Sequence, residues 1–216
     1  MSRARFDSDL RRDSGLGGSA VLVGVDEAGR GPLAGPVVAA AVVLAVGGHP
    51  DLSGVRDSKL LSARLRRAFR EAILRRARAV SVGWATPSEI DRDNILASTL
   101  AAMRRAVLRV AAACGPVPVL VVVDGNRHIP RLGLRQVAIP EADDLSLSVA
   151  AASVLAKVTR DSWMERLDRR YPGYGMAEHK GYGTPRHLES LAALGPCPAH
   201  RRTFAPVSAR EPVRSR

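Results

Sequence analysis

Residues 20–37 read AVLVGVDEAGRGPLAGPV, and they contain a short apolar run, an acidic pair and a loop rich in Gly and Pro. The run Val21–Val25 is typical of a strand that is covered on both faces. Asp26 and Glu27 follow this run directly, at the exit of the predicted strand. A second apolar run over residues 37–46 follows the loop, so the two runs predict adjacent buried strands.

The remaining chain alternates between strand and helix patterns. Thr86 and Glu89 form a capping box with Pro87 at the first helical position, which marks a helix start. Because the chain shows no repeat and no domain-scale linker, the pattern predicts one α/β domain with a helical C-terminal part. Further strands are predicted at 80–85, 117–123 and 134–139, and helices at 62–77, 86–114, 144–170 and 184–195.

Composition excludes several classes of protein. The 216 residues are 46% hydrophobic and 25% charged, which is ordinary globular usage and excludes wholesale disorder, collagen and coiled coil. Two cysteines cannot form a disulfide framework, and no secretion signal is seen, so a cytoplasmic location is expected. The longest apolar run, residues 36–46, is too short for a membrane span. We expect a flexible leader at 1–19, a domain at 20–207 and a basic tail at 208–216.

The balance of charge predicts a polyanionic partner. The chain has 33 basic and 21 acidic residues, a formal net charge of +12, as expected of a protein that meets nucleic acid. Nearly all the basic residues are Arg, so a single Arg carries little information. The three lysines, Lys59, Lys157 and Lys180, are the more informative cations because a compact ammonium differs from a planar guanidinium.

Acidic residues stand at the ends of two predicted strands and at one helix start. Asp124 follows the strand at 117–123, as Asp26 and Glu27 follow the first strand, and Asp143 or Asp144 begins a long helix. Each has an ordinary role as a loop or capping residue. If the strands are neighbours, however, the carboxylates converge and need a cation to offset their repulsion.

The ligand types favour a hard metal ion. A ligand set made of carboxylate oxygens, with no His or Cys, favours Mg²⁺ or Mn²⁺. Cys197 and His200 form a single pair of zinc-type ligands, and the second pair that a zinc site needs is not found in the sequence. Two divalent ions ~3.5–4 Å apart promote phosphodiester displacement. A basic body around such a site suits a nuclease.

Two glycine loops are candidates for substrate contact. Gly29, Arg30 and Gly31 allow the backbone to approach a ligand closely, although a tight turn between strands also explains them. The loop at 179–184, HKGYGT, places Tyr182 and Lys180 on flexible backbone, a mixture that binds sugar and phosphate. A simple helix entry is the alternative for this second loop.

Taken together, these segments resemble the ribonuclease HII family, the type 2 ribonucleases H, over roughly residues 23–207. The resemblance rests on several separate blocks. These are GVDEAGRGPLAGPV at 24–37, Asp57-Ser58-Lys59, Glu89-Ile90-Asp91 with Asn94-Ile95, Val123-Asp124-Gly125, Ala151-Ala152-Ser153, AKVTRD at 156–161, Tyr171-Pro172 and HKGYGT at 179–184.

The resemblance implies a ribonuclease H-like mixed β-sheet flanked by helices, with a small helical C-terminal part. It implies that Asp26, Glu27, Asp124 and Asp143 hold two divalent ions, Mn²⁺ or Mg²⁺. The family usually has a Gly-Asp pair at the fourth position, where this chain has EADD at 141–144. Asp143 is chosen because it lies ten residues before Ser153, and Asp144 is the alternative.

The resemblance also implies the substrate and the reaction. Gly29, Arg30, Gly31 and Tyr182 are expected to recognise the 2′-hydroxyl of a ribonucleotide within a duplex. Cleavage is expected on its 5′ side, leaving 3′-hydroxyl and 5′-phosphate ends, in embedded ribonucleotides and in RNA/DNA hybrids, for removal of misincorporated ribonucleotides from DNA. Candidate phosphate contacts are Lys59, Lys157, Lys180, Arg201 and Arg202.

Other assignments remain open from the sequence. The related type HIII enzymes carry a long amino-terminal extension and a glutamate as fourth carboxylate, so the roughly twenty residues before the first motif and Asp143 favour type HII. A hybrid-binding protein without catalysis and another ribonuclease H-like nuclease, such as a junction resolvase, are the alternatives. A monomer is expected, because a long duplex must reach the site unobstructed.

Overall fold

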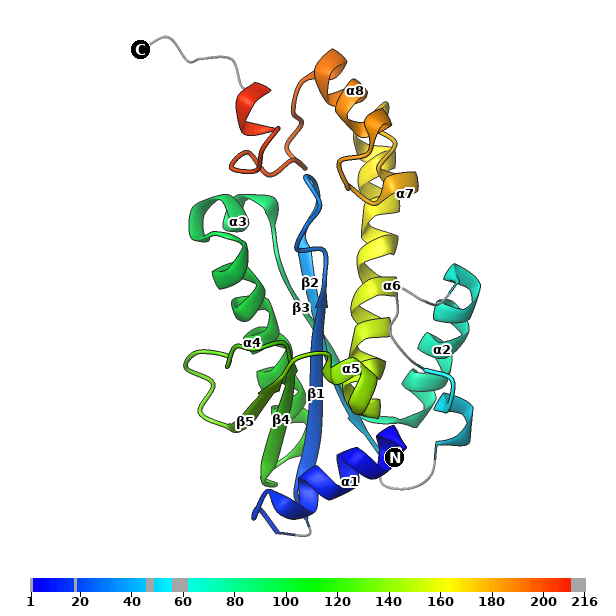
Figure 1. Ribbon diagram of the computed structural model, residues 1–216, viewed down its shortest axis with the longest axis vertical. Helices are drawn as coiled ribbons and strands as arrows, with labels where there is room; N and C mark the ends of the chain where they lie inside the picture. The colour runs from blue at the N-terminus through cyan, green and yellow to red at the C-terminus, as the bar shows by residue number, and fades with distance from the viewer. Residues whose placement is uncertain (1, 18, 46–48, 56–61, 211–216) are drawn as a thin grey trace.

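The computed structural model describes residues 2–17, 19–45, 49–55 and 62–210 of the chain. Its centre is a mixed five-stranded sheet in the order β3-β2-β1-β4-β5 (Figure 1). β1 pairs antiparallel with β2 and parallel with β4, while β2–β3 is antiparallel and β4–β5 parallel. The sheet confirms the predicted mixed α/β fold. The strands are β1 (Val21–Ala28), β2 (Val37–Leu44), β3 (Ala77–Ala85), β4 (Val119–Asp124) and β5 (Arg135–Ile139).

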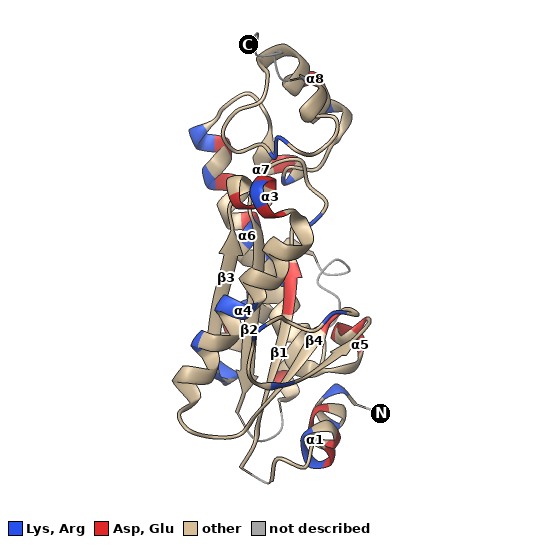
Figure 2. Ribbon diagram, turned by 90° about the vertical axis from the view of Figure 1, so that its left-hand side faces the viewer, with Lys and Arg blue, Asp and Glu red and all other residues tan. Residues whose placement is uncertain are grey.

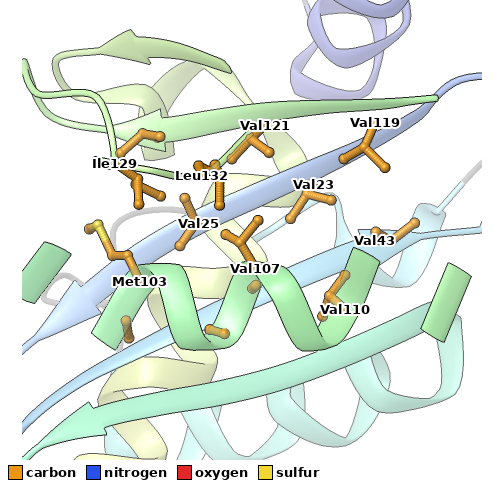
Figure 3. Packing of buried hydrophobic residues seen from close by; sticks show 14 of the residues in the cluster. Val23, Val25, Val43, Met103, Val107, Val110, Val119, Val121, Ile129 and Leu132 are labelled. Carbon is orange, nitrogen blue, oxygen red and sulfur yellow. The ribbon is translucent and has the colours of Figure 1, made fainter. Parts of the chain in front are cut away.

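The sheet is buried because helices cover both faces. Successive side chains of a strand point to opposite faces, so Val23 and Val25 of β1 pack with Val107 and Met103 of α4 (Ile95–Cys114) in one apolar cluster (Figure 3). Leu22 faces the other side and clusters with Val149 of α6 (Leu147–Arg170). This double burial explains why β1, β2 and β4 are continuous apolar runs rather than alternating ones.

The contact between β1 and α6 is unusually close. A Cβ atom on Gly24 would overlap the backbone of Ser148 and Val149 in the first turns of α6. A residue without a side chain is therefore required at this position, and it lets α6 run directly beneath the strand that carries Asp26. Helix α2 (Ala63–Arg76) covers the outer side of α6, and its apolar residues share a cluster with it.

The helix starts follow the capping signals in the sequence. The capping box of Thr86 and Glu89 is present at the start of α3 (Pro87–Asp93). The predicted helix at 86–114 is interrupted at Asn94, whose φ of 67° lies in the left-handed region and whose side chain caps α4. The predicted helix at 144–170 is likewise divided at Ser146 into α5 (Ala142–Leu145) and α6.

The C-terminal part is helical, as predicted, and lies beyond one end of the sheet (Figure 1). It contains α7 (Met176–His179), α8 (Pro185–Leu194) and a final 3-10 turn at Ser208–Arg210. Within the described residues, no helix has the length and apolar character needed to cross a membrane.

The amino-terminal segment differs from the expected flexible leader. Residues Arg3–Asp13 form helix α1, which has no buried residue and an N-cap at Ser2. Because α1 lacks an apolar stripe, no periodicity reveals it in the sequence. Polar contacts stabilise it, such as the ion pair of Arg12 with Asp9 at 2.7 Å and the hydrogen bonds to α5 and α6 described below. Partly buried Ala4 and Leu10 also pack against apolar clusters of the domain.

Candidate active site

The exits of β1 and β4 meet at one edge of the sheet. The two strands are parallel, with Val25 opposite Val123, so Asp26 and Asp124 follow at the same level on neighbouring strands. Because successive side chains of a strand point to opposite faces, the carboxylates of Asp26 and Asp124 lie on the face covered by α6, and Glu27 points to the other face. Figure 2 shows the acidic tip of β1 in red at this end of the sheet. The adjacency expected from the two strand exits is therefore present.

Asp26 is the most deeply buried of these carboxylates, at 6% exposure. One of its oxygens accepts the backbone N–H of Glu27 at 2.6 Å, and the side chain of Ser153 on α6 also hydrogen-bonds to it. Burial raises the pKa of Asp26 well above its usual range, and the charges of Glu27 and Asp124 raise it further, against the hydrogen bonds. A cation at this position would relieve the same repulsion.

Glu27 stands between an acidic and a basic neighbour. Its carboxylate pairs with the guanidinium of Arg30 at 3.4 Å. Burial raises the pKa of Glu27, the charge of Arg30 lowers it, and the charge of Asp124 raises it, with a net upward shift. The charge of Asp124 therefore raises the pKa of both Asp26 and Glu27.

Asp124 connects the strand end to the helix that carries Asp143. Its Oδ1 accepts the backbone N–H of Ala142 at 2.7 Å, so the first turn of α5 is attached to the exit of β4. Asp143 is half-buried at this turn, whereas the side chain of Asp144 is 61% exposed and paired with Arg3 at 3.2 Å. Of the two candidates for a fourth carboxylate, Asp144 is therefore the more exposed.

All four carboxylates line one cavity of about 690 Å³, here called the carboxylate cavity. Within the described residues, no three His, Cys, Asp or Glu side chains come close enough to enclose a metal ion in their present conformations. Oxygens of Asp26, Glu27 and Asp124 are instead bound to the partners named above. The donor set nevertheless fits a hard cation, because it is all oxygen, acidic and largely buried. The wall also includes Gly29, Arg30, Gly31, Arg66, Glu141, Asp144, Ser153, Lys157, Arg160 and Tyr182.

Two buried arginines hold the glycine loop at the rim of this cavity. Arg201 donates to the carbonyls of Gly29 at 2.5 Å, Arg30 at 2.8 Å and Gly35 at 3.0 Å. Arg160 donates to the carbonyls of three further residues at 3.0–3.1 Å, which are Ala34, Pro36 and Lys180. The loop therefore has a fixed path, and Gly29 takes a φ of 97° where a Cβ would collide with Arg160.

This arrangement corrects the interpretation of Arg201 as a phosphate contact. Its side chain is fully buried, and its guanidinium is committed to backbone carbonyls inside the protein. Burial, and next the charge of Arg160, lower the pKa of Arg201 to about 9, which still leaves it protonated near pH 7. Arg202 is exposed, so a role in phosphate contact stays a prediction for that residue.

Tyr182 lies on the opposite rim and is 48% exposed. A Cβ built on Gly31 would be 3.8 Å from the tyrosine ring, so the two glycine loops predicted from the sequence face each other across the cavity mouth. The backbone N–H of Leu33 also donates to the carbonyl of Gly181 at 2.8 Å. The loops are thus joined by backbone as well as by Arg160.

Buried histidines support the Tyr182 loop. His187 donates from Nδ1 to the carbonyl of Tyr182 at 2.9 Å, so its Nε2 accepts from His200 at 3.1 Å. Nδ1 of His200 accepts the backbone N–H of Cys197 at 3.1 Å, which requires the same tautomer. Burial lowers the pKa of His187, and burial with the charge of His187 lowers the pKa of His200 to about 4. Both rings are therefore neutral near pH 7.

The three lysines have different locations. Lys157 lines the carboxylate cavity and pairs with Asp161 at 2.7 Å. Lys180 lies instead in a neighbouring groove between α2 and α6 and pairs with Glu165 at 3.0 Å. Lys59 lies outside the described residues.

Sequence reasoning did not assign roles to Ser153 and Arg160. A polar residue at the end of the Ala150–Ala152 run, on the face of α6 beneath β1, is the signal that identifies Ser153 as a partner of Asp26. Arg160 has no such signal, because arginine is so frequent in this chain that a buried one looks like the rest.

Comparison with known proteins shows the family of this chain. The sequence model of the family described as Ribonuclease HII matches residues 23–207. A protein of Delftia acidovorans named Ribonuclease HII is 53% identical over 191 residues, covering 87% of this chain and 77% of the relative. A second of that name, from Geotalea uraniireducens, is 49% identical over 214 residues, covering 99% and 93%.

Solved structures show the same fold. Ribonuclease H2 of Pyrococcus horikoshii has a TM-score of 0.71 and 28% identity, covering 88% of this chain and 96% of that one. RNase HII of Archaeoglobus fulgidus, solved in a complex with PCNA, has a TM-score of 0.70 and 30% identity, covering 85% and 95%. Bst-RNase HIII, solved with Mn²⁺, is 21% identical with a TM-score of 0.67, covering 90% and 70%, and shares the fold.

Proposed function

Because this chain belongs to the ribonuclease HII family, we propose that it incises duplex DNA at embedded ribonucleotides, in addition to its ribonuclease H activity on RNA/DNA. Family members are hydrolytic endoribonucleases, and the family generally uses divalent metal ions. In the proposed reaction the cut lies on the 5′ side of the ribonucleotide and leaves 3′-hydroxyl and 5′-phosphate ends. Its role is the removal of misincorporated ribonucleotides from DNA.

The observation that carries the proposal is that the four carboxylates line the same cavity as Gly29, Arg30, Gly31 and Tyr182. Asp26, Glu27, Asp124 and Asp143 would hold the metal, and their all-oxygen chemistry favours Mg²⁺ or Mn²⁺. Two divalent ions, when bound, supply Lewis-acid stabilisation of the phosphate and a nucleophile at neutral pH. Coordination requires these side chains to leave some present partners, such as Arg30 for Glu27.

The rim supplies the selectivity. Arg201 donates to the carbonyls of Gly29 and Arg30, and the side chain of Arg160 packs against Gly29. The ring of Tyr182 lies across the cavity mouth from Gly31. A ribonucleotide between these loops offers its 2′-hydroxyl to backbone groups and its sugar to the aromatic face. The 2′-hydroxyl is the group by which a protein distinguishes RNA from DNA.

The surrounding cations fit a polyanionic duplex. Lys157 lies on the wall of the cavity, and Lys180 lies in the adjoining groove, with Arg66 lining both. We assign phosphate contacts to Lys157 and Lys180 and, outside the described residues, to Lys59. The protein is proposed to act as a monomer.

Replacing Asp124 tests the assignment of the carboxylates. Asp124→Asn keeps the size of the side chain and an acceptor for Ala142 but removes the negative charge, so cleavage should fall by at least a hundredfold while duplex binding persists. Asp93→Asn is the matched control, because Asp93 is an exposed carboxylate on α3 that pairs with Arg92. Near-normal cleavage by the Asp124 variant would refute the assignment. Binding without metal-dependent cleavage in the unmodified protein would instead indicate a hybrid-binding protein.

Replacing Tyr182 tests the source of selectivity. Because the ring is half exposed, Tyr182→Ala should leave stability almost unchanged, while the preference for a ribonucleotide over an all-DNA site should fall. Tyr182→Phe keeps the aromatic face and should retain most of that preference. Equal selectivity in the Ala variant and the unmodified protein would remove Tyr182 from recognition.

A further inference from the structure

Helix α1 contacts the region that carries the proposed fourth carboxylate. In Figure 1 it lies at the end of the molecule where α5 and α6 begin. Arg3 donates from Nε to the carbonyl of Asp144 at 3.0 Å and from Nη2 to its carboxylate at 3.2 Å. Its Nη1 donates to the carbonyl of Val55 at 2.9 Å. One guanidinium thus joins α1, α5 and the segment before α2.

Asp7 makes a second attachment, one turn further along α1. Its Oδ2 accepts both the backbone N–H and the hydroxyl of Ser148, each at 2.9 Å, and the Ser146 side chain also hydrogen-bonds to it. Helix α6 has no acidic residue in its own first turn. Asp7 therefore supplies, from another element, the negative charge that favours a helix N-terminus.

Helix α5 depends on such outside contacts. It has four residues, and a single helical turn is not stable by itself in water. On its inner side the N–H of Ala142 is bound by Asp124, and on its outer side Asp144 is bound by Arg3. Asp143 lies between these two anchored residues, so its position depends on both attachments.

We propose that α1 positions Asp143 toward the carboxylate cavity, with Arg3 and Asp7 as positioning residues that act through α5 and the first turn of α6. This inference rests on the proposed function, because it takes Asp143 as a metal ligand. It gives the amino-terminal segment a role in metal affinity rather than in contact with the substrate.

The first test is a titration with Mn²⁺ in the absence of substrate. Electron paramagnetic resonance measures the concentration of free Mn²⁺ and so gives the affinity. Arg3→Ala should weaken Mn²⁺ binding by about tenfold, the lower end of the usual effect of residues that orient metal ligands. The Mn²⁺ concentration for half-maximal cleavage should rise in parallel, with kcat at saturating Mn²⁺ and KM for the duplex nearly unchanged. Arg5→Ala is the matched control, since Arg5 lies on the same helix and its ion pair is with Asp9 of that helix, at 3.8 Å.

A double-mutant cycle tests whether Arg3 acts through Asp144. If it does, Arg3→Ala and Asp144→Asn combined should weaken Mn²⁺ binding no more than the stronger single change. Additive effects would mean that Arg3 acts by another route. Amide hydrogen exchange over residues 142–149 should also be faster in Arg3→Ala than in Arg5→Ala.

Two outcomes separate this inference from the proposed function. If Asp143→Asn leaves Mn²⁺ binding unchanged, the ligand assignment fails. If Asp143→Asn weakens binding but Arg3→Ala and Asp7→Asn do not, the ligand assignment stands and the positioning role of α1 is refuted. A lowered melting temperature in Arg3→Ala with unchanged Mn²⁺ affinity would likewise refute it, because α1 would then only stabilise the fold.

Discussion

Replacement of the buried Arg201 by Met would remove the strongest support of the glycine loop at the cavity rim. The methionine side chain fills much of the same space, but the carbonyls of Gly29, Arg30 and Gly35 lose their donor. A hydrogen bond to a charged group contributes about 1.5–3 kcal/mol, so three of them contribute roughly 5–9 kcal/mol. The contact of the guanidinium with the Phe204 ring, 5.1 Å from its centroid, is lost as well.

The cost of burying the charge offsets part of this sum. An effective penalty of several kcal/mol accompanies a buried ion, and its effect is visible in the lowered pKa of Arg201, about 9. The net loss of unfolding free energy in Arg201→Met should therefore be about 3 kcal/mol. For a domain of this size, that corresponds to a fall in Tm of roughly 6–12 °C.

Urea unfolding followed by circular dichroism measures this directly, with the midpoint expected to fall at an unchanged m-value. Arg202→Met is the matched control for stability, because its side chain is exposed and the bond to Asp91 comes from its backbone N–H. If Arg201→Met unfolds at the same urea concentration as this control, the buried guanidinium does not hold the loop. Preference for a ribonucleotide should also decline in Arg201→Met, because the glycine loop at the cavity rim would no longer be held in one conformation.

Three further predictions concern the framework of the site. Gly24→Ala forces a Cβ into the backbone of Ser148 and should lower stability by about 1–3 kcal/mol or more in urea unfolding, whereas no loss would disprove the close contact. Thr86→Ala removes a capping box and should cost about 1 kcal/mol, measured the same way, and a neutral effect would mean that tertiary contacts alone hold α3. The pKa of His200 is lowered from 6.5 to about 4 in the folded protein, so the unfolded chain binds a proton first and stability should decline as the pH falls from 6.5 toward 4. His200→Gln should flatten this decline in melting curves, and an unaltered decline would assign it to other groups.

The parts of the fold that depend on burial were predictable from the sequence. Because β1, β2 and β4 are covered on both faces, they are apolar runs that stand out from the rest of the chain. Their exits were predictable too, since Asp26 and Asp124 follow the runs directly and parallel neighbours end at the same edge. The capping box at Thr86 marked a helix start correctly because its signal is local.

The parts that depend on long-range polar contacts were not predictable. Helix α1 has no apolar stripe and is held by Arg3 and Asp7 to residues about 140 positions away. The interruption at Asn94 depends on a left-handed residue within a continuous helical pattern. The burial of Arg201 depends on carbonyls that a distant loop supplies, and in a chain with this many arginines composition gives no indication of it.

The carboxylate cavity is proposed to cut a duplex on the 5′ side of a ribonucleotide. The most direct measurement uses an end-labelled DNA duplex with one ribonucleotide, beside all-DNA and RNA/DNA hybrid duplexes, in Mg²⁺, Mn²⁺ or chelator, with the products mapped to single-nucleotide resolution. We predict metal-dependent incision at the 5′ side of the ribonucleotide and no incision of the all-DNA duplex. Cleavage at another position, or equal cleavage of the all-DNA duplex, would contradict the proposed function.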